Sequence, residues 1–149
     1  MYRDKETVLK VISHNPVERL PYYFDFTPPA REKVERYYGG PIEEVLNFPI
    51  RMKGCKSIKP LYADPEVYGE ILKDEFGVVW KTSKIDRGVP IKHPLTEPDI
   101  SNYKFPDYSA PYRFEELGKW CEENKEHFLI IWVGDLWERA TFMRGMRAN

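Results

Sequence analysis

Long apolar runs are missing from this chain of 149 residues. No segment approaches the roughly 20 consecutive apolar residues that a membrane-spanning helix needs. The opening stretch, MYRDKETVLK, also lacks the apolar core of a secretory signal. These two absences argue against a membrane partner and predict a cytoplasmic protein.

Neither sign of charge is in large excess, because the chain has 23 lysine and arginine residues and 24 aspartate and glutamate residues, for a net charge of -1. We therefore expect no nucleic-acid partner, which would require a basic surface. Cysteine is scarce, and Cys55 and Cys121 lie far apart without CxxC or Cys-His spacing. This spacing argues against a disulfide framework and against a self-contained zinc site, and it predicts two reduced thiols.

The clearest pattern that is present lies in the stretch HFLIIWVGDLWERATFMRG, residues 127–145. Residues 128–133 form an unbroken apolar run, which predicts a strand buried on both faces. Residues 136–144 predict a helix that carries Leu136, Ala140 and Met143 on its apolar side and ends at Gly145. A strand followed directly by a helix is one unit of a parallel α/β fold, in which the loop after the strand holds the chemistry.

The other elements are predicted from periodicity and from the positions of proline and glycine. In chain order they are a helix at 4–13 with Asp4 as a possible N-cap, a first barrel strand at 22–26 (YYFDF), a helix at 29–38 closed by Gly39 and Gly40, a short helix at 41–48, a strand at 50–58, a helix or turn at 65–75, a β-hairpin or meander of strands 75–83 and 89–93, an ordered connector at 94–111 and a helix at 112–125. Arg51 and Lys53 share one face of the strand at 50–58, which we expect to be a solvated edge.

Four phrases occur in this order along the chain: HNPVERLPYYFDF, KDEFGVVWKTS, VPIKHPLTEPDISNYKFPD and VGDLWERATFMRG. The ordered set resembles the N-terminal part of the uroporphyrinogen decarboxylase superfamily, which includes cobalamin-dependent and coenzyme M methyltransferases. Proteins of that family are (β/α)₈ TIM-type barrels of more than twice this length. The resemblance implies an α/β fold over residues 1–149, namely the N-terminal portion of such a barrel with an inserted β-meander.

The segment after the first predicted strand favours the methyltransferase branch. Uroporphyrinogen decarboxylases carry a Met-Arg-Gln-Ala-Gly-Arg phrase there, whose arginines hold substrate carboxylates, whereas this chain reads FDFTPPARE and offers only Arg31. The resemblance therefore implies that the complete relative transfers a methyl group between a corrinoid and a thiol.

Zinc is expected only in the complete relative. The similar methyltransferases bind it through a His-x-Cys pair and a further cysteine in the later half of the barrel, where the metal stabilises the acceptor thiolate. None of His14, His93 and His127 lies two residues before a cysteine. We predict no metal ligand and no bound cofactor in this chain, with zinc and a corrinoid possible in the complete relative.

Six residues are expected to line the pocket of that relative. The candidates for catalysis are Asp25, near the C-terminal end of the first predicted strand, and Asp135, which follows the strand at 128–133; those for substrate binding are Arg31, Trp137, Arg139 and Arg144. Each has a structural alternative: Asp25 as a helix cap or a partner of Arg31, Arg139 in an ion pair with Asp135 or Glu138, and Trp137 in the core. For His93 we expect a surface or hydrogen-bonded role. The side chains of Asp74 and Glu75 should point apart because they are adjacent.

The expected partners are a small-molecule substrate or a corrinoid protein. A homo-oligomer is also expected, because a partial barrel leaves strand edges unpaired. The chain corresponds to the first half of a barrel or less, so we expect it to be inactive alone. Two alternatives stay open: a decarboxylase of uroporphyrinogen or another carboxylate, and a non-enzymatic binding or interaction module.

Overall fold

The computed structural model describes residues 5–60 and 62–146 as a mixed α/β structure. In chain order its elements are α1 (Lys5–Ile12), α2 (Pro28–Tyr38), α3 (Ile42–Val45), β1 (Ile50–Gly54), α4 (Pro65–Tyr68), β2 (Ile71–Lys73), β3 (Val79–Lys81), β4 (Val89–Lys92), the 3₁₀ helix η1 (Pro111–Arg113), α5 (Leu117–Glu123), β5 (Phe128–Trp132) and α6 (Leu136–Arg144).

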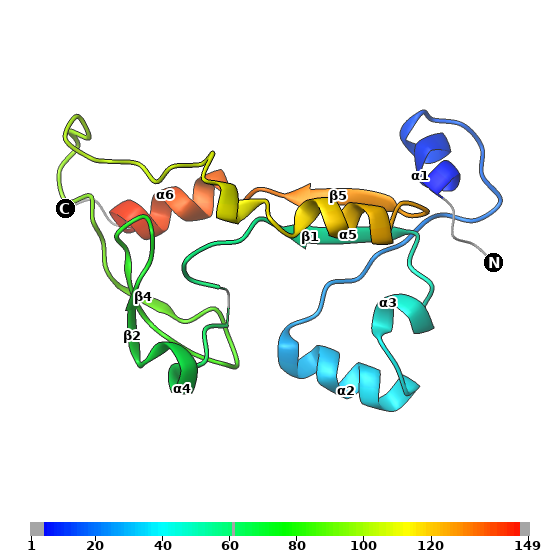
Figure 1. Cartoon of the computed structure of the whole chain (residues 1–149), viewed down its shortest axis with the longest axis horizontal. Coiled ribbons are helices and arrows are strands. Elements are labelled where there is room, and N and C mark those ends of the chain that lie inside the picture. The colour runs from blue at the N-terminus through cyan, green and yellow to red at the C-terminus, as the bar shows by residue number, and fades with distance from the viewer. Residues whose placement is uncertain (1–4, 61, 147–149) are drawn as a thin grey trace. The chain divides into compact units, whose positions relative to one another are not determined.

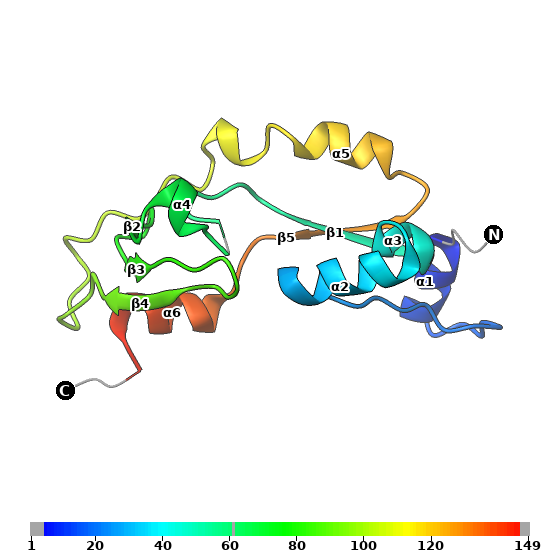
Figure 2. The ribbon, with the colours of Figure 1, turned by 90° about the horizontal axis from the view of Figure 1, so that it is seen from below.

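The chain folds into two compact units. The first comprises the chain up to Cys55 together with Phe114–Trp132, and the second comprises Lys56–Arg113 together with the chain from Val133 onward. Each unit has its own sheet, which is the β1–β5 pair in the first and β2–β3–β4 in the second. Figure 1 labels helices and strands of both units, and Figure 2 also labels β3.

The sheet of the first unit confirms the predicted parallel arrangement. β1 and β5 run in parallel, in a register that starts at Ile50 opposite Phe128 and ends at Gly54 opposite Trp132. In Figure 2, α5 runs along one side of this pair. The predicted burial of β5 on both faces is wrong, because Ile130, Ile131 and Trp132 are 36–39% exposed. A parallel strand becomes buried only when strands flank it and helices cover both faces, and β5 pairs with a single strand.

The predicted first barrel strand at 22–26 is also wrong. This segment is extended, but it pairs with no strand in the described part of the chain. Its aromatic side chains pack instead on Phe48, which is fully buried, with the rings of Tyr22, Tyr23 and Phe24 at centroid distances of 5.6–5.9 Å. The Tyr22 hydroxyl donates a hydrogen bond to the Leu46 carbonyl at 2.6 Å. Ring packing and this bond fix the segment without a strand partner.

The predicted solvated edge at Arg51 and Lys53 is wrong for Arg51. Because β1 pairs with β5, Arg51 is only 6% exposed, and its guanidinium donates to the Phe48 carbonyl at 2.6 Å and to Glu44 at 2.9 Å. Lys53 is partly exposed and pairs with Glu116 at 3.1 Å.

The helices of the first unit follow the predictions in part. α1 and α2 form where periodicity placed them, and α2 ends at Gly39, whose φ of 78° is left-handed and whose amide donates to the Glu35 carbonyl. The proposed capping role of Asp4 lies outside the described residues. α3 and α5 are shorter than predicted, and α5 begins five residues late because η1 and a turn precede it.

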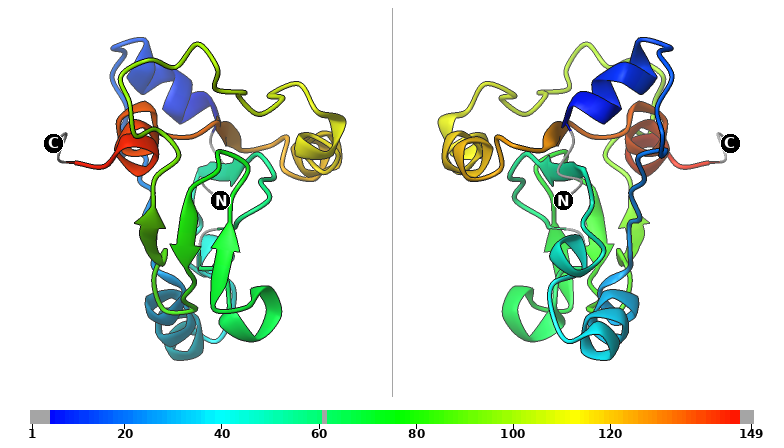
Figure 3. Two further views of the ribbon diagram at one scale, coloured as in Figure 1. Left: turned by 90° about the vertical axis from the view of Figure 1, so that its left-hand side faces the viewer. Right: turned by 90° about the vertical axis from the view of Figure 1, so that its right-hand side faces the viewer.

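The second unit contains the two predicted strands as β3 and β4, whereas β2 lies in the segment at 65–75 that was predicted to be a helix or turn. β2 pairs antiparallel with β3, and β3 pairs antiparallel with β4. Figure 3 shows the three strands side by side. The turn before β4 requires glycine at position 88, because its φ is +81° and an added Cβ would lie 2.5 Å from the Lys81 carbonyl oxygen.

α6 supplies the core of the second unit together with this meander. Val78, Trp80 and Met143 are buried, and the ring of Phe142 lies 4.9 Å from that of Trp80. The predicted apolar side of α6 is right only at Met143, because Leu136 is 94% exposed and Ala140 is exposed. The end of the helix is tied to the chain after β4 by a hydrogen bond from the Leu95 amide to the Met143 carbonyl at 3.0 Å.

The connector after β4 is ordered, as predicted. It has turns but no strand or helix before η1, and the Tyr103 hydroxyl ties it to the Phe76 carbonyl at 2.7 Å. Both cysteines are free thiols, as predicted. The strands of residues 5–60 and 62–146 form no closed barrel. Across the same residues, no helix combines the length and apolar character needed to cross a membrane.

Replacing Phe48 with alanine should destabilise the protein strongly. The substitution opens a cavity beneath three aromatic rings, which typically lowers the free energy of unfolding by about 3–5 kcal/mol. Chemical denaturation followed by tryptophan fluorescence would measure the loss. The matched control is Phe114→Ala, because Phe114 is 45% exposed and its truncation should cost less than about 1 kcal/mol. Equal losses in the two variants would contradict this account of the core.

Candidate functional site

The six predicted pocket residues are divided between the two units. Asp25 and Arg31 belong to the first unit, whereas Asp135, Trp137, Arg139 and Arg144 belong to the second. The contacts of each group come from its own unit.

Arg31 lies on α2 and is held by two carboxylates. Its guanidinium donates to Glu35 at 3.0 Å and to both oxygens of Glu43, at 3.0 Å and 2.5 Å. The hydrogen bond from Arg31 holds the pKa of the Glu43 carboxyl below its usual range. The same pairing raises the pKa of Arg31. An anionic substrate at Arg31 would have to compete with two resident carboxylates.

Asp25 is exposed and engages its own backbone. Its Oδ1 accepts a hydrogen bond from the next amide, that of Phe26, at 2.9 Å. The expected ion pair with Arg31 does not form, because Arg31 pairs with Glu35 and Glu43 instead. Burial raises the pKa of the neighbouring Tyr23, and the negative charges of Asp25 and Glu43 raise it further. The carboxylate of Asp25 is accessible to a ligand.

Asp74 organises the second unit, although the sequence marked it only as one of two adjacent acids. One carboxylate oxygen accepts the amides of Phe76 and Val78, both at 2.9 Å. The other accepts the indole N–H of Trp80 and the guanidinium of Arg139, also at 2.9 Å. Asp74 is 7% exposed, so these bonds replace its hydration.

Arg139 is therefore a structural partner of Asp74. The expected alternatives, Asp135 and Glu138, do not pair with it, and Glu138 pairs with Arg87 at 2.7 Å. The guanidinium carbon of Arg139 also lies 4.0 Å from the centre of the Phe76 ring, which places the cation over an aromatic face. The carboxylate and the aromatic ring fix Arg139 within the unit.

Lys59 is buried beside this network. Its ammonium group donates to the carbonyls of Pro60 and Arg87 at 3.2 Å and 2.9 Å, and it lies 4.4 Å from the centre of the Trp80 ring. Burial lowers the pKa of Lys59, an effect that the charge of Asp74 opposes. The lysine links the chain before α4 to the turn before β4.

The remaining candidates on α6 differ in their contacts. Asp135 takes the N-cap position but makes no side-chain capping bond, and it is exposed. Trp137 is 77% exposed, so the structural alternative that placed it in the core is wrong. Arg144 donates to the Leu95 carbonyl at 3.4 Å. Asp135 and Trp137 are thus the α6 candidates whose side chains face solvent.

Glu75 forms a second buried ion pair that sequence reasoning did not find. Its carboxylate pairs with Arg113, with one contact at 3.1 Å, and accepts the Tyr112 hydroxyl at 3.1 Å. Asp74 and Glu75 therefore point to different partners, as expected for adjacent residues. No local spacing signals the pairing, because 38 residues separate Glu75 from Arg113.

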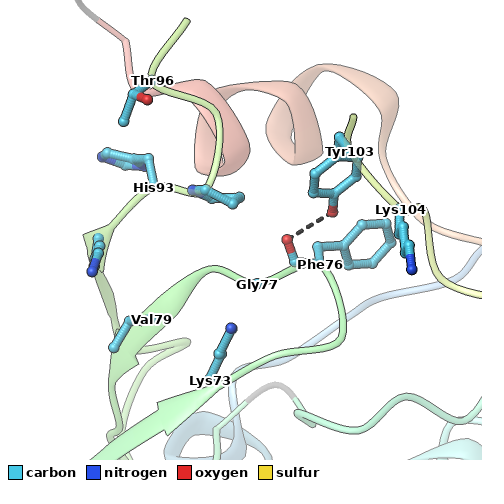
Figure 4. A pocket seen from close by; sticks show the side chains of 10 residues that line it. Lys73, Phe76, Gly77, Val79, His93, Thr96, Tyr103 and Lys104 are labelled. Atoms are coloured by element: carbon cyan, nitrogen blue, oxygen red, sulfur yellow. Dashed lines mark hydrogen bonds between the residues drawn. The ribbon is translucent and has the colours of Figure 1, made fainter. Parts of the chain in front are cut away.

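An open basin lies on the second unit, beside the network of Asp74. We call it the lysine basin, and it is lined by Lys73, Phe76, Val79, Lys92, His93 and Lys104, with a volume of about 610 Å³ (Figure 4). His93 is hydrogen-bonded, as expected, through Nδ1 to the Phe142 carbonyl at 2.7 Å. Sequence reasoning missed the three lysines. The sequence contains one signal, namely that Lys73 and Lys92 each pair with Val79. This signal can be read only once the strand register is known.

A metal-binding cluster is not found among the described residues. No three histidine, cysteine, aspartate or glutamate side chains of residues 5–60 and 62–146 come together in a way that could hold a metal ion.

Comparison with known proteins gives no match to a protein-family model, a curated protein or a solved structure.

Replacing Glu43 with glutamine should reduce stability in a pH-dependent way. The pKa of Glu43 is lowered in the folded protein, so its ion pair contributes stability that is present above the ordinary value of 4.5 and lost as pH falls through the folded value. Wild type should exceed Glu43→Gln by about 1 kcal/mol near pH 7. Urea denaturation from pH 7 to pH 3 should show this difference shrinking below pH 4.5. A constant difference would contradict the pairing with Arg31.

Replacing Asp74 with asparagine should destabilise the second unit. The variant keeps the shape of the side chain but removes the charge that Arg139 needs, and it turns one acceptor into a donor. Because Arg139 is 36% exposed and water can partly replace its partner, we expect a loss of about 2 kcal/mol. Thermal and urea denaturation would measure it, with the exposed Asp135→Asn as the control. A loss no larger than that of the control would refute the role of Asp74.

Proposed function

We propose that this chain forms the first part of a uroporphyrinogen-decarboxylase-like barrel whose complete form transfers a methyl group between a corrinoid and a thiol. The observation that carries the proposal is the parallel pair β1–β5, whose connection contains α4, the sheet β2–β3–β4, η1 and then α5, with α6 directly after β5. A parallel pair joined through a crossover helix and followed by another helix is the repeating unit of such barrels.

The exposure of β5 supports the same proposal. Its last three side chains are more than a third exposed, although they are Ile130, Ile131 and Trp132. Parallel strands of this composition are normally covered on both faces. Further strands and helices of a complete barrel, or a second copy of the chain, would cover them.

Within this proposal the chain contributes binding groups. Asp25 and Asp135 are exposed acids that could accept a hydrogen bond from a substrate, and Trp137 offers an exposed aromatic surface. Zinc, when bound in the complete relative, would stabilise the acceptor thiolate. Its ligands would have to come from elsewhere in that relative, because residues 5–60 and 62–146 hold no metal-binding cluster.

The state of Arg31 disfavours the rival decarboxylase. A porphyrinogen carries many carboxylates, and its recognition needs arginines that are available for bidentate pairing. Arg31 is the single arginine in the expected segment, and it already binds Glu35 and Glu43.

The test combines the mass of the native protein with an assay of methyl transfer. Intact mass spectrometry of the protein from its source cells should find a species at least about twice the 17.7 kDa of this chain, as a full barrel requires. That native protein should demethylate methylcobalamin in the presence of a thiol, followed by the change in the visible spectrum. The 149-residue chain alone should not.

Two results would contradict the proposal. Turnover of a porphyrinogen by the native protein, without turnover of methylcobalamin, would establish the decarboxylase. A native species of 17.7 kDa that is stable, monodisperse and inactive would establish the interaction module.

A further inference from the structure

The strand register of the second unit places two lysines on one face of the meander. Val79 of β3 lies directly opposite Lys73 of β2 on one side and opposite Lys92 of β4 on the other. Residues directly opposite in a sheet point to the same face, and all three residues line the basin although the β3–β4 register shifts between Val79 and Trp80. Because neighbouring strands are about 4.8 Å apart, the two lysine backbones are separated by roughly 10 Å, with Val79 between them.

The connector adds a third cation and a side wall. Lys104 follows Tyr103, whose hydroxyl is held by the Phe76 carbonyl at 2.7 Å. Figure 4 shows Tyr103 and Lys104 on one side of the lysine basin and His93 and Thr96 on the other. This hydrogen bond fixes the connector against the turn between β2 and β3.

The cations of the lysine basin lack resident counter-charges. Lys73, Lys92 and Lys104 form no ion pair within residues 5–60 and 62–146, and the described lining contains no acidic residue. Elsewhere on the surface, lysines such as Lys53 and Lys84 do pair with glutamates. Three unpaired cations around one basin produce a positive local potential, although the whole chain is close to neutral.

The floor of the basin is apolar, and the Lys73 side chain packs close to it. Phe76, Val79 and Pro94 supply it, and Gly77 leaves space where an added Cβ would lie 3.3 Å from Pro94 and 3.6 Å from the Lys73 side chain. The aliphatic part of Lys73 thus lies against the floor, and in Figure 4 its ammonium end points toward the basin.

His93 supplies a polar group of defined orientation. Its Nδ1 lies 2.7 Å from the Phe142 carbonyl, which can only accept, so Nδ1 carries a proton. In the neutral ring Nε2 is then an acceptor for a hydroxyl or N–H of a ligand.

We propose that the lysine basin binds a small organic molecule with an apolar body and at least two anionic oxygen groups, either carboxylate or phosphate. The apolar body would lie over Val79 and Phe76 while Lys73 and Lys92 hold the anionic groups at its two ends. Ammonium groups bind either oxyanion as point charges, so the two sources share one chemistry. This site lies within the second unit and does not depend on the proposed methyl transfer.

The test uses the full chain and three probes. Naphthalene-2,6-dicarboxylate represents the carboxylates, naphthalene-2,6-diyl bisphosphate represents the phosphates, and naphthalene-2,6-dimethanol is the neutral control. Titrations followed by amide NMR should show saturable shifts at Gly77, Val79 and His93 with at least one anionic probe. Binding should weaken as salt is raised, because exposed charges are screened. The probe that binds more tightly shows whether the basin prefers carboxylate or phosphate groups.

Matched variants distinguish binding of the probe in the lysine basin from attraction to surface charge in general. The double variant Lys73→Gln/Lys92→Gln should weaken binding of the tighter probe at least tenfold, whereas Lys33→Gln, an exposed lysine of α2, should change it less than twofold. The three substituted lysines, Lys33, Lys73 and Lys92, are exposed, so the variants should fold, and their NMR spectra would confirm it. Three results would each overturn the proposal: no binding of either anionic probe, equal binding of the neutral probe, or equal losses in the double variant and Lys33→Gln.

Discussion

The carboxylate of Asp74 is the interaction on which the second unit depends. It joins the turn between β2 and β3, the indole of Trp80 and the guanidinium of Arg139 on α6. A buried carboxylate is costly unless its lone pairs are satisfied, and here four donors share its two oxygens. The meander and α6 therefore meet in one arrangement, in which Phe142 and Met143 cover Trp80.

The first unit is held differently, by aromatic packing rather than by a buried charge. Phe48 has no exposed surface, and three aromatic rings of the extended segment at 22–26 pack against it. Arg51 adds a polar link by donating to the Phe48 carbonyl while it pairs with Glu44. The parallel pair β1–β5 carries the proposal of a larger barrel, and the exposure of Ile130, Ile131 and Trp132 supports it.

Local pattern was sufficient to predict α1, α2, α6 and the pair β3–β4, because capping glycines, prolines and periodicity act within a few residues. It failed at Tyr22–Phe24, where long-range ring packing replaces strand pairing, and at Ile130–Trp132, where burial depends on neighbours that periodicity does not reveal. The site predictions met the same limit. Arg139 was identified as important, but its partner Asp74 lies 65 residues away, and the lysine basin exists only because the register aligns Lys73 with Lys92. Composition averaged over the chain hides such a local concentration of charge.

The chain passes from one unit to the other at Cys55–Lys56, Arg113–Phe114 and Trp132–Val133, so the second unit is assembled from two separated segments. During synthesis, Asp74 and Trp80 leave the ribosome well before Arg139 and Phe142. Until α6 has been made, Asp74 lacks its partner Arg139 and Trp80 lacks the cover of Phe142. Closure of this core is a late, long-range event, and such contacts slow folding because the loop must close before they form.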